Sequence, residues 1–444
     1  MNLGSLVGHL LELLRSGERS SQPIDRATAE FFRRRGYLGS HDRRYIADHY
    51  FGIIRHRRFL EALLEQASAD LPGGELLDKF PDRFVVLVLL YGLSSSPEPA
   101  VETIIPPALW KTSFPSIDLG LFTDWYRDYR SLAFLGPDEL VRLGVRHSFQ
   151  DWMVRLWSDR LVQEAGELLE SMNLPAPVAL RVNTLRCSVG ECLERLKKEG
   201  VEAVPGRLAP HALLLRKRFS AQSTPAFRDG WFEIQDEGSQ MVSLLADPAP
   251  GWRVIDACAG AGGKSLHLAA IMQNRGEILA IDPDRKKLAE LGTRAVRSGV
   301  SIIRTAQSDA GDGVPSPAPA DLVLVDAPCT GSGTIRRNPA LKWRLNEQSP
   351  AEYHRKQVEI LERCAQLVRP GGRLVYSTCS LFPQENEEVV RDFTAGNGKF
   401  RAVPFTGPGA AIVPGDHPGE CTLYPHRHGT DGFFISLLLR NSES

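Results

Sequence analysis

The sequence predicts a multidomain chain with an all-α N-terminal bundle, a small α+β module, and a C-terminal α/β domain whose doubly wound sheet is mostly parallel. Three observations predict this fold class. Apolar residues recur at intervals of three and four up to about residue 145, which is typical of amphipathic helices. From 150 to 235 short strand-like and helical stretches are mixed. From 236 to 441 strand-like and helical stretches alternate, as they do when helices cover a parallel sheet.

The helical region, residues 1–145, contains HLLELL, DRRYIADHYFGIIRHRRFLEALLEQ, FVVLVLLYGL and LVRLGV, and SSSPEPA interrupts it. Its first 60 residues hold eleven arginines, no lysine and six acidic residues, a local charge of +5 (11 − 6). A guanidinium group binds two phosphate oxygens at once, so this composition is compatible with nucleic acid. A solvated helical surface produces the same pattern, so charge alone leaves both interpretations open.

The two later regions are predicted from their apolar runs. In the module, WMVRLWSDRLVQEAGELLESM and CSVGECLERLKKEG have helical spacing, whereas VALRVNT, ALLLRKR and WFEIQ are strand-like. In the C-terminal domain the expected strands are RVIDACAG, EILAIDPD, IIRTAQSDA, DLVLVDAPC, RLVYSTCS and GFFISLLLR. The helices expected between them are KSLHLAAIMQ, RKKLAELGTRAVRSG and AEYHRKQVEILERCAQLV.

The overall composition is that of an ordinary globular protein, with 42% apolar and 24% charged residues and a net charge of −1. Seven cysteines without disulfide spacing or a CxxC pair predict free thiols and no structural zinc. His426 and His428 lack a third ligand, so no metal site is expected.

There is no signal-peptide pattern, and no apolar run reaches the ~18 residues that span a bilayer. We therefore expect a cytoplasmic protein that does not enter a membrane.

Four acids lie near the ends of successive predicted strands, where ligands bind in doubly wound sheets. They are Asp256, Asp282, Asp309 and Asp326. The glycine turn after the first strand lacks the full spacing of a dinucleotide or P-loop motif. The acids instead favour S-adenosylmethionine, with its ribose hydroxyls on Asp282 and its adenine near Asp309, although helix capping is an alternative role for each. The predicted cofactor residues are Cys258, Ala259, Gly260, Ala261, Gly262, Gly263, Lys264, Asp282, Asp309 and Asp326.

Two cysteines, Cys329 and Cys379, follow two of these strands. Methylation of a pyrimidine ring carbon needs a thiolate, because addition to carbon 6 makes carbon 5 nucleophilic, and a base must then take the carbon-5 proton. One thiol as nucleophile and one as helper in release accounts for both. We expect Asp326 to hold the cytosine ring with a raised pKa in the complex, and Lys264 to lower the pKa of a thiol. The other five cysteines, Cys187, Cys192, Cys258, Cys364 and Cys421, are not expected to be catalysts, because a free cysteine is mostly a small core residue.

The same stretches resemble the Sun/Nop family of RNA (cytosine-5) methyltransferases. The similar motifs are DACAGAGGKSLHLA, AIDPD, QSDA, DLVLVDAPCTGSGTIRRNPALKW and YSTCSLFPQENEEVV, with WFEIQDEGSQM before them and PHRHGTDGFFISLLLR after them. The resemblance implies a Rossmann-like class I methyltransferase domain, with Cys379 as the nucleophile and Cys329 in product release. Ala261 stands where the family usually has proline, which predicts a looser turn.

The N-terminal LGSHDRRYIADHYFGIIRHRRFLEALLEQ resembles the NusB-like RNA-binding domain of bacterial 16S ribosomal RNA cytosine-5 methyltransferases, and the RVNT module resembles the family's RNA-recognition-like domain. This implies a monomer that binds RNA, with small-subunit ribosomal RNA as the expected substrate. Transfer RNA, or a role as a non-catalytic RNA-binding factor, is the alternative. The target cytosine has to be unpaired or flipped out. The expected RNA contacts are Arg181, Asn183, Arg336, Arg337 and Lys342.

Overall fold

The computed structural model describes residues 1–18, 24–95, 100–217, 221–310, 318–413 and 417–442. The chain forms two compact units. The first, the helical unit, comprises Met1–Asn173 together with Arg337–Arg344. The second, the sheet unit, comprises Leu174–Arg336 and Leu345–Ser444. The predicted three-part boundaries at 1–145, 150–235 and 236–441 stay a prediction.

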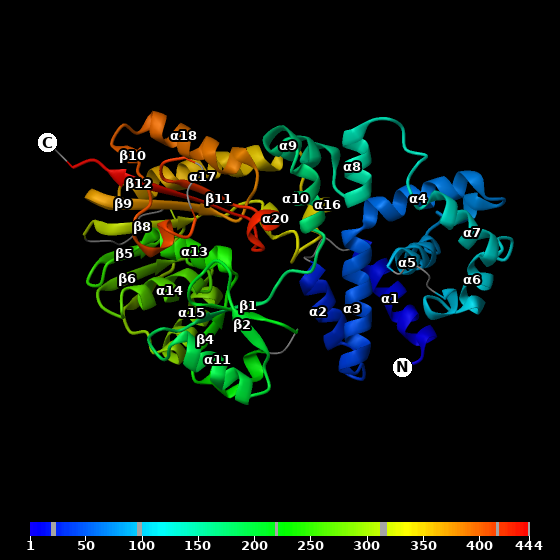
Figure 1. Ribbon diagram of the computed structural model, residues 1–444, viewed down its shortest axis with the longest axis horizontal. Coiled ribbons are helices and arrows are strands. Elements are labelled where there is room, and N and C mark those ends of the chain that lie inside the picture. Colours follow the sequence, from blue (N-terminus) through cyan, green and yellow to red (C-terminus); the bar gives the residue numbers. More distant parts are fainter. Residues whose placement is uncertain (19–23, 96–99, 218–220, 311–317, 414–416, 443–444) are drawn as a thin grey trace. The chain divides into compact units, whose positions relative to one another are not determined.

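In the described part of the helical unit, the helices between residues 3 and 147 surround one apolar core (Figure 1). Asp118 and Asp138 cap two of them by accepting hydrogen bonds from backbone amides of the first turn. Within the described ranges, no helix of either unit is long and apolar enough to cross a bilayer. The helices are α1 (Leu3–Glu18), α2 (Ile24–Arg33), α3 (Ser40–Arg55), α4 (Arg57–Asp70), α5 (Arg83–Ser94), α6 (Pro107–Ser113), α7 (Leu119–Tyr129), α8 (Glu139–His147), α9 (Asp151–Leu161), α10 (Ala165–Ser171) and α16 (Leu341–Arg344), with 3-10 turns at Gly74–Leu76 and Val101–Thr103.

Lys342, on α16, is buried in the helical unit and does not reach solvent. Its ammonium donates to the carbonyl oxygens of Arg55 (3.0 Å) and His147 (3.1 Å) and to Oδ1 of Asn173 (2.6 Å). It also lies 3.7 Å from the centre of the Phe149 ring, a cation–π contact. All three N–H groups are therefore used inside the protein, and the prediction that Lys342 contacts RNA is wrong.

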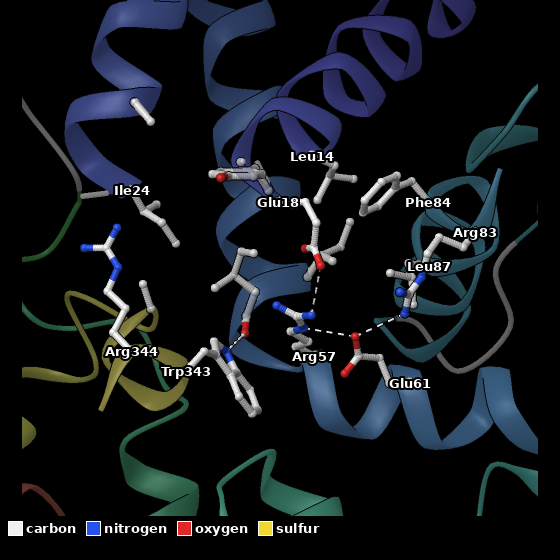
Figure 2. A pocket seen from close by; sticks show the side chains of 16 residues that line it. Leu14, Glu18, Ile24, Arg57, Glu61, Arg83, Phe84, Leu87, Trp343 and Arg344 are labelled. Atoms are coloured by element: carbon white, nitrogen blue, oxygen red, sulfur yellow. Dashed lines mark hydrogen bonds and ion pairs between the residues drawn. The ribbon is translucent and has the colours of Figure 1, made fainter. Parts of the chain in front are cut away.

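A pocket of about 230 Å³ opens among helices α1 to α5 and α16 (Figure 2). A chain of ion pairs runs along it: Arg57 contacts Glu18 (3.3 Å) and Glu61 (2.9 Å), and Arg83 contacts Glu61 (3.2 Å). The indole of Trp343 donates to a backbone carbonyl of α3 (2.8 Å). Two of the arginines in the lining are thus neutralised by carboxylates, and the basic composition of this region does not make the pocket strongly positive.

The sheet unit begins with a small module, a four-stranded antiparallel sheet in the order β2-β3-β1-β4. Ser188 and Glu191 form a capping box at the start of its main helix. The elements are β1 (Ala179–Val182), α11 (Val189–Lys198), β2 (Ala203–Pro205), β3 (Ala212–Leu215), the 3-10 turn Ala221–Ser223, α12 (Pro225–Arg228) and β4 (Phe232–Ile234).

Arg181 and Asn183 of this module are interior residues, only 3% and 5% exposed. The guanidinium of Arg181 donates to the side chain of Gln235 and to the carbonyl of Gly263 (2.6 Å). The amide of Asn183 donates to the carbonyls of Gly230 (2.8 Å) and Ser298 (2.9 Å). Both side chains join the module to the larger sheet of the same unit, so the prediction that they bind RNA is wrong.

The larger sheet has the strand order β10-β12-β9-β8-β5-β6-β7, with β11 paired to β12. Strands β5 to β9 are parallel, and the edge formed by β10, β11 and β12 is antiparallel. The predicted fold class is confirmed. The elements are α13 (Glu237–Ala246), β5 (Arg253–Asp256), α14 (Gly263–Ile271), β6 (Glu277–Ile281), α15 (Arg285–Ser298), β7 (Ile303–Ala306), β8 (Ala320–Asp326), a 3-10 turn (Ser332–Thr334), α17 (Ser349–Ala365), β9 (Val368–Thr378), η5 (Pro383–Glu385), α18 (Glu387–Gly396), β10 (Phe400–Ala402), α19 (Gly407–Ala410), β11 (Glu420–Leu423), α20 (Pro425–His428) and β12 (Phe433–Arg440).

Helices cover both faces of this sheet (Figure 1). Along β8, Leu322 and Leu324 pack into the core that contains α13 and α14, whereas Val323 and Val325 pack into the core that contains α17 and α18. Because successive side chains of a strand point to opposite faces, a continuous apolar run fills both cores. The predicted acids Asp256, Asp282 and Asp326 and the thiol of Cys379 lie at the carboxyl ends of these buried strands.

Candidate active site

The parallel strands β5, β6, β8 and β9 end at one edge of the sheet, and each carries a polar side chain at or just beyond its last residue. These side chains belong to Asp256, Asp282, Asp326 and Cys379. Carboxyl ends of neighbouring parallel strands meet at the same edge, so residues far apart in the sequence come together.

The glycine turn between β5 and α14 has two residues with positive φ, Gly260 (+54°) and Gly262 (+82°). A Cβ on Gly262 would lie 1.9 Å from a methyl carbon of Leu291, so close packing against α15 requires glycine here. A Cβ on Gly260 would meet nothing within 4 Å, so this side of the turn is open. Asp282 accepts the Gly260 amide (2.9 Å) and the Asp284 amide (2.8 Å), which fixes its carboxylate beside the open side.

Ala261, in place of the expected proline, is held from outside the turn. Its carbonyl accepts a hydrogen bond from the guanidinium of Arg294 (2.7 Å), and the same guanidinium pairs with the buried carboxylate of Glu233 (3.0 Å). An arginine and a glutamate from other elements thus restrain the backbone that proline would stiffen. Sequence reasoning missed both residues, because nothing in a helix of mixed charge or in a short strand distinguishes them from surface residues.

Lys264, the second residue of α14, forms an ion pair with Asp326 at 2.5 Å. The hydroxyl of Ser377 donates to the other oxygen of this carboxylate (2.9 Å). Burial lowers the pKa of Lys264, but the negative charge and hydrogen bond of Asp326 outweigh it, so the pKa is raised from its ordinary value. The lysine is therefore a fixed cation at the centre of the strand-end cluster.

The sulfur atoms of Cys329 and Cys379 lie 3.3 Å apart. Strands β8 and β9 are adjacent and parallel, with Asp326 opposite Ser377, so the loops that follow them meet. The contact with Cys379 and burial raise the pKa of Cys329 well above its usual range. A negative charge on Cys379 contributes to the raised pKa of Lys264. The cluster thus holds a protonated Cys329 in contact with the Cys379 sulfur.

Comparisons with known proteins match the sheet unit and the end of the helical unit that precedes it in the chain. The model of the family described as 16S rRNA methyltransferase RsmB/F matches residues 243–439, and that of its ferredoxin-like domain matches 149–222. The "Probable ribosomal RNA small subunit methyltransferase B" of Synechocystis sp. is 31% identical over 414 residues, which are 90% of this chain and 92% of the relative. The chain belongs to the RsmB/F family.

Two further similarities agree with this assignment. The Bacillus subtilis protein of the same printed name is 36% identical over 67% of this chain and 68% of its own. The crystal structure of the protein PH0851 has 30% identity, a TM-score of 0.75, and 97% coverage of both chains. The resemblance to the Sun/Nop family is confirmed, and this RsmB/F chain is an RNA methyltransferase whose methyl donor is S-adenosylmethionine.

The strand-end residues of the RsmB/F chain fit such a cofactor. The glycine turn leaves space at Gly260, and Asp282, 6% exposed, keeps a free lone pair on each oxygen for ribose hydroxyls. Asp309 is exposed, beyond the end of β7, where it can meet a ligand. Burial raises the pKa of Cys258 well above its usual range, so this thiol is not a nucleophile.

The two arginines after Cys329, Arg336 and Arg337, differ in their exposure. Arg336 is 8% exposed, and its guanidinium donates to the carbonyls of Pro175 (3.2 Å) and Gly429 (3.3 Å) within the sheet unit. The prediction that Arg336 binds RNA is therefore wrong, because its donors serve the protein. Arg337 is exposed, and its predicted RNA contact stays a prediction.

One residue that the sequence did not single out stands beside both cysteine loops of the RsmB/F chain. Glu385 is fully buried and accepts hydrogen bonds from Thr330 and Ser380, the residues that follow the two cysteines. Its only sequence signal was its place in the PQEN stretch, six residues after Cys379. The glutamate at that position belongs to no periodic pattern or motif spacing that would indicate burial.

Replacement of Asp256 by asparagine is expected to change how stability depends on pH. Burial raises the pKa of Asp256 from 3.8 to about 6. The folded state thus holds a proton that the unfolded state releases, and this stabilisation is full below pH 4 and disappears as the pH rises through 6. The group's contribution should fall by roughly 3 kcal/mol across that window.

Urea unfolding of the wild type and of Asp256→Asn at several pH values between 4 and 8 measures the effect. Asparagine keeps an oxygen for the Ser265 hydroxyl, which donates to Asp256 at 2.6 Å, but it has no charge to bury. The variant should gain stability relative to the wild type as the pH rises. Parallel pH profiles for the two proteins would show that Asp256 does not titrate in this window.

Proposed function

We propose that this RsmB/F chain methylates carbon 5 of a cytosine in 16S ribosomal RNA through a transient bond between Cys379 and carbon 6. The observation that carries the proposal is the 3.3 Å approach of the Cys329 and Cys379 sulfurs beside the Lys264–Asp326 ion pair. Methylation of oxygen or of an exocyclic nitrogen needs no thiol, so a pair of thiols at the cofactor edge supports a ring carbon as the acceptor.

Each residue of the cluster has a role in this chemistry. The Cys379 thiolate forms a bond to carbon 6 with the Lys264 ammonium as the cation of the cluster, and the electron pair of the ring double bond moves toward carbon 5. Asp326 holds the ring nitrogen and the amino group of the cytosine. After carbon 5 has accepted the methyl group, Cys329 first releases its own proton to solvent and then takes the carbon-5 proton as a thiolate. The ring double bond forms again, and the Cys379 sulfur leaves as a thiolate.

The cofactor contributes an electrophilic methyl group when bound. On this proposal, Asp282 binds its ribose hydroxyls, Asp309 lies near its adenine, and the turn at 258–264 receives the remainder. Lys264 and Asp326 belong to both sites, since their ion pair lies between the glycine turn and the cysteine loops.

The substrate is proposed from the printed names of the relatives, which are ribosomal RNA small subunit methyltransferases. A cytosine inside a duplex cannot reach two sulfurs at a sheet edge, so the target is unpaired or flipped out. Arg337 is proposed to contact a phosphate. Cytosine-5 methylation of transfer RNA is the alternative enzymatic function, and a non-catalytic RNA-binding role is the alternative outside catalysis.

An assay with tritiated S-adenosylmethionine separates these functions. The purified full-length chain is incubated with protein-free 16S ribosomal RNA, with assembled small subunits and with transfer RNA, and bisulfite sequencing locates the product. We expect 5-methylcytosine in 16S ribosomal RNA. Methylation of transfer RNA alone contradicts the proposed substrate, methylation at another atom contradicts the chemistry, and cofactor binding without incorporation into any RNA favours the binding factor.

A further inference from the structure

Glu385 is a fully buried carboxylate that contacts both cysteine loops. One oxygen accepts the hydroxyls of Thr330 and Ser380 (2.6 Å for Ser380), and the other accepts the Thr330 amide (2.8 Å) and the Gln357 amide (3.1 Å). Thr330 follows Cys329 and Ser380 follows Cys379. Each reactive sulfur is therefore one residue away from a group that binds the same carboxylate.

The environment of Glu385 makes burial of its carboxylate unfavourable in free energy, which is unusual for an acid with a purely structural role. Among the described residues, no lysine, arginine or histidine forms an ion pair with it. Burial raises its pKa from the ordinary value, while the hydrogen bonds to Ser380 and Thr330 counteract this. A buried charge balanced only by neutral donors depends on all of them, so the four hydrogen bonds define the geometry of the two loops closely.

The two loops do not depend on Glu385 equally. The Cys379 loop has other restraints: the Cys379 carbonyl accepts the Gly333 amide (2.9 Å), and the Asn386 side chain bonds Thr378 (2.6 Å) and the Ser380 carbonyl (3.0 Å). In the Cys329 loop, the Gln357 amide donates to the Pro328 carbonyl (3.0 Å), and Glu385 accepts both the amide and the hydroxyl of Thr330. Removal of the carboxylate should therefore displace Cys329 more than Cys379.

We propose that Glu385 is a positioning residue that holds the Cys329 thiol against Cys379, so that release follows methyl transfer. This proposal rests on the proposed function. In the release step, the carbon-5 proton moves to the Cys329 sulfur, the electron pair of the broken C–H bond forms the ring double bond, and the bond from carbon 6 to the Cys379 sulfur breaks. The step needs both sulfurs within reach of adjacent ring atoms, which the Glu385 hydrogen bonds ensure.

Glu385→Ala tests the proposal in the full-length chain. A displacement of about 1 Å reduces a positioned step about 100-fold, so we expect turnover to fall by about that factor. The specific readout is a protein–RNA adduct that persists on a denaturing gel, with single-turnover methyl transfer reduced far less than steady-state turnover. A residue that only stabilises the fold would lower both rates together and leave no adduct.

Glu385→Gln is the conservative variant. Its carbonyl oxygen can accept the Thr330 and Gln357 amides, while its NH₂ faces two hydroxyls that can act as acceptors. We therefore expect it to restore most of the turnover and to abolish the adduct. Glu388→Ala is the matched control, since Glu388 is an acid three residues along with only a 4.0 Å contact to Arg391, and it should behave like the wild type.

Thr330→Val is a second test of the proposal in case Glu385→Ala does not fold. It removes one hydroxyl donor and keeps the amide, and it should leave a smaller amount of adduct. Normal turnover without adduct in folded Glu385→Ala, or in Thr330→Val, overturns the role of Glu385. Failure of the proposed function is distinguishable, because in that case Cys329→Ala also gives no adduct and the wild type forms no 5-methylcytosine.

Discussion

Replacement of Cys379 by alanine is expected to reduce 5-methylcytosine formation by roughly 10⁴-fold or more and to prevent any covalent protein–RNA species. Without a sulfur bonded to carbon 6, carbon 5 is not nucleophilic enough to accept a methyl group. The neighbouring thiol does not substitute for it, because the pKa of Cys329 is raised and it remains protonated. Tritium incorporation and a denaturing gel with labelled RNA measure the two effects.

Cys364→Ala is the matched control for this variant. Cys364 is also a free cysteine of the sheet unit, but it is 1% exposed, and burial raises its pKa to about 12. Its loss should leave methyl transfer at the wild-type level. An adduct that forms in Cys379→Ala and disappears when Cys329 is also replaced would reverse the roles of the two thiols.

Replacement of Cys329 by alanine is expected to have the opposite signature: one methyl group is transferred per enzyme molecule, and the protein then stays attached to the RNA. The causes that raise the pKa of Cys329 include its hydrogen bond to Cys379 and the charge of that sulfur. Both of these causes disappear once the Cys379 sulfur is bonded to carbon 6, while burial remains. Loss of the Cys329 proton to solvent therefore becomes easier, and Cys329 can act as the base for release. Alanine cannot accept the carbon-5 proton.

The measurement is the fraction of enzyme that migrates with labelled RNA on a denaturing gel after one turnover, which should approach the amount of active enzyme. The double variant Cys329→Ala/Cys379→Ala should give none, which shows that the bond is to Cys379. Normal multiple turnover of Cys329→Ala would falsify the assignment of Cys329 to release.

The sequence predicted the features that depend on local pattern. Apolar runs located the parallel strands, and the acid or thiol after each run marked the site edge, since strand ends of a parallel sheet must meet. Cys329 and Cys379 could be expected to approach one another because both follow such strands, and the structure places their sulfurs in contact.

Features that depend on tertiary contacts could not be predicted in this way. Arg181, Arg336 and Lys342 were predicted to contact RNA, but they use their donors on buried carbonyls and side chains. Glu385 was not predicted for the same reason, since the sequence alone does not distinguish a buried glutamate from one on the surface. The antiparallel partners β10 and β11 are short and contain few apolar residues, so their pattern is too weak to indicate strands.

The register of β8 against β9 limits how the length of this gene can change during evolution. Asp326 lies opposite Ser377, and consecutive side chains alternate between the two faces. The pairing is regular from Leu322–Arg373 to Asp326–Ser377, and insertion or deletion of a single codon within that part of either strand would turn the following polar residue away from its partner. Gains and losses of residues between the two thiols should therefore accumulate in the crossover around α17, outside both strands.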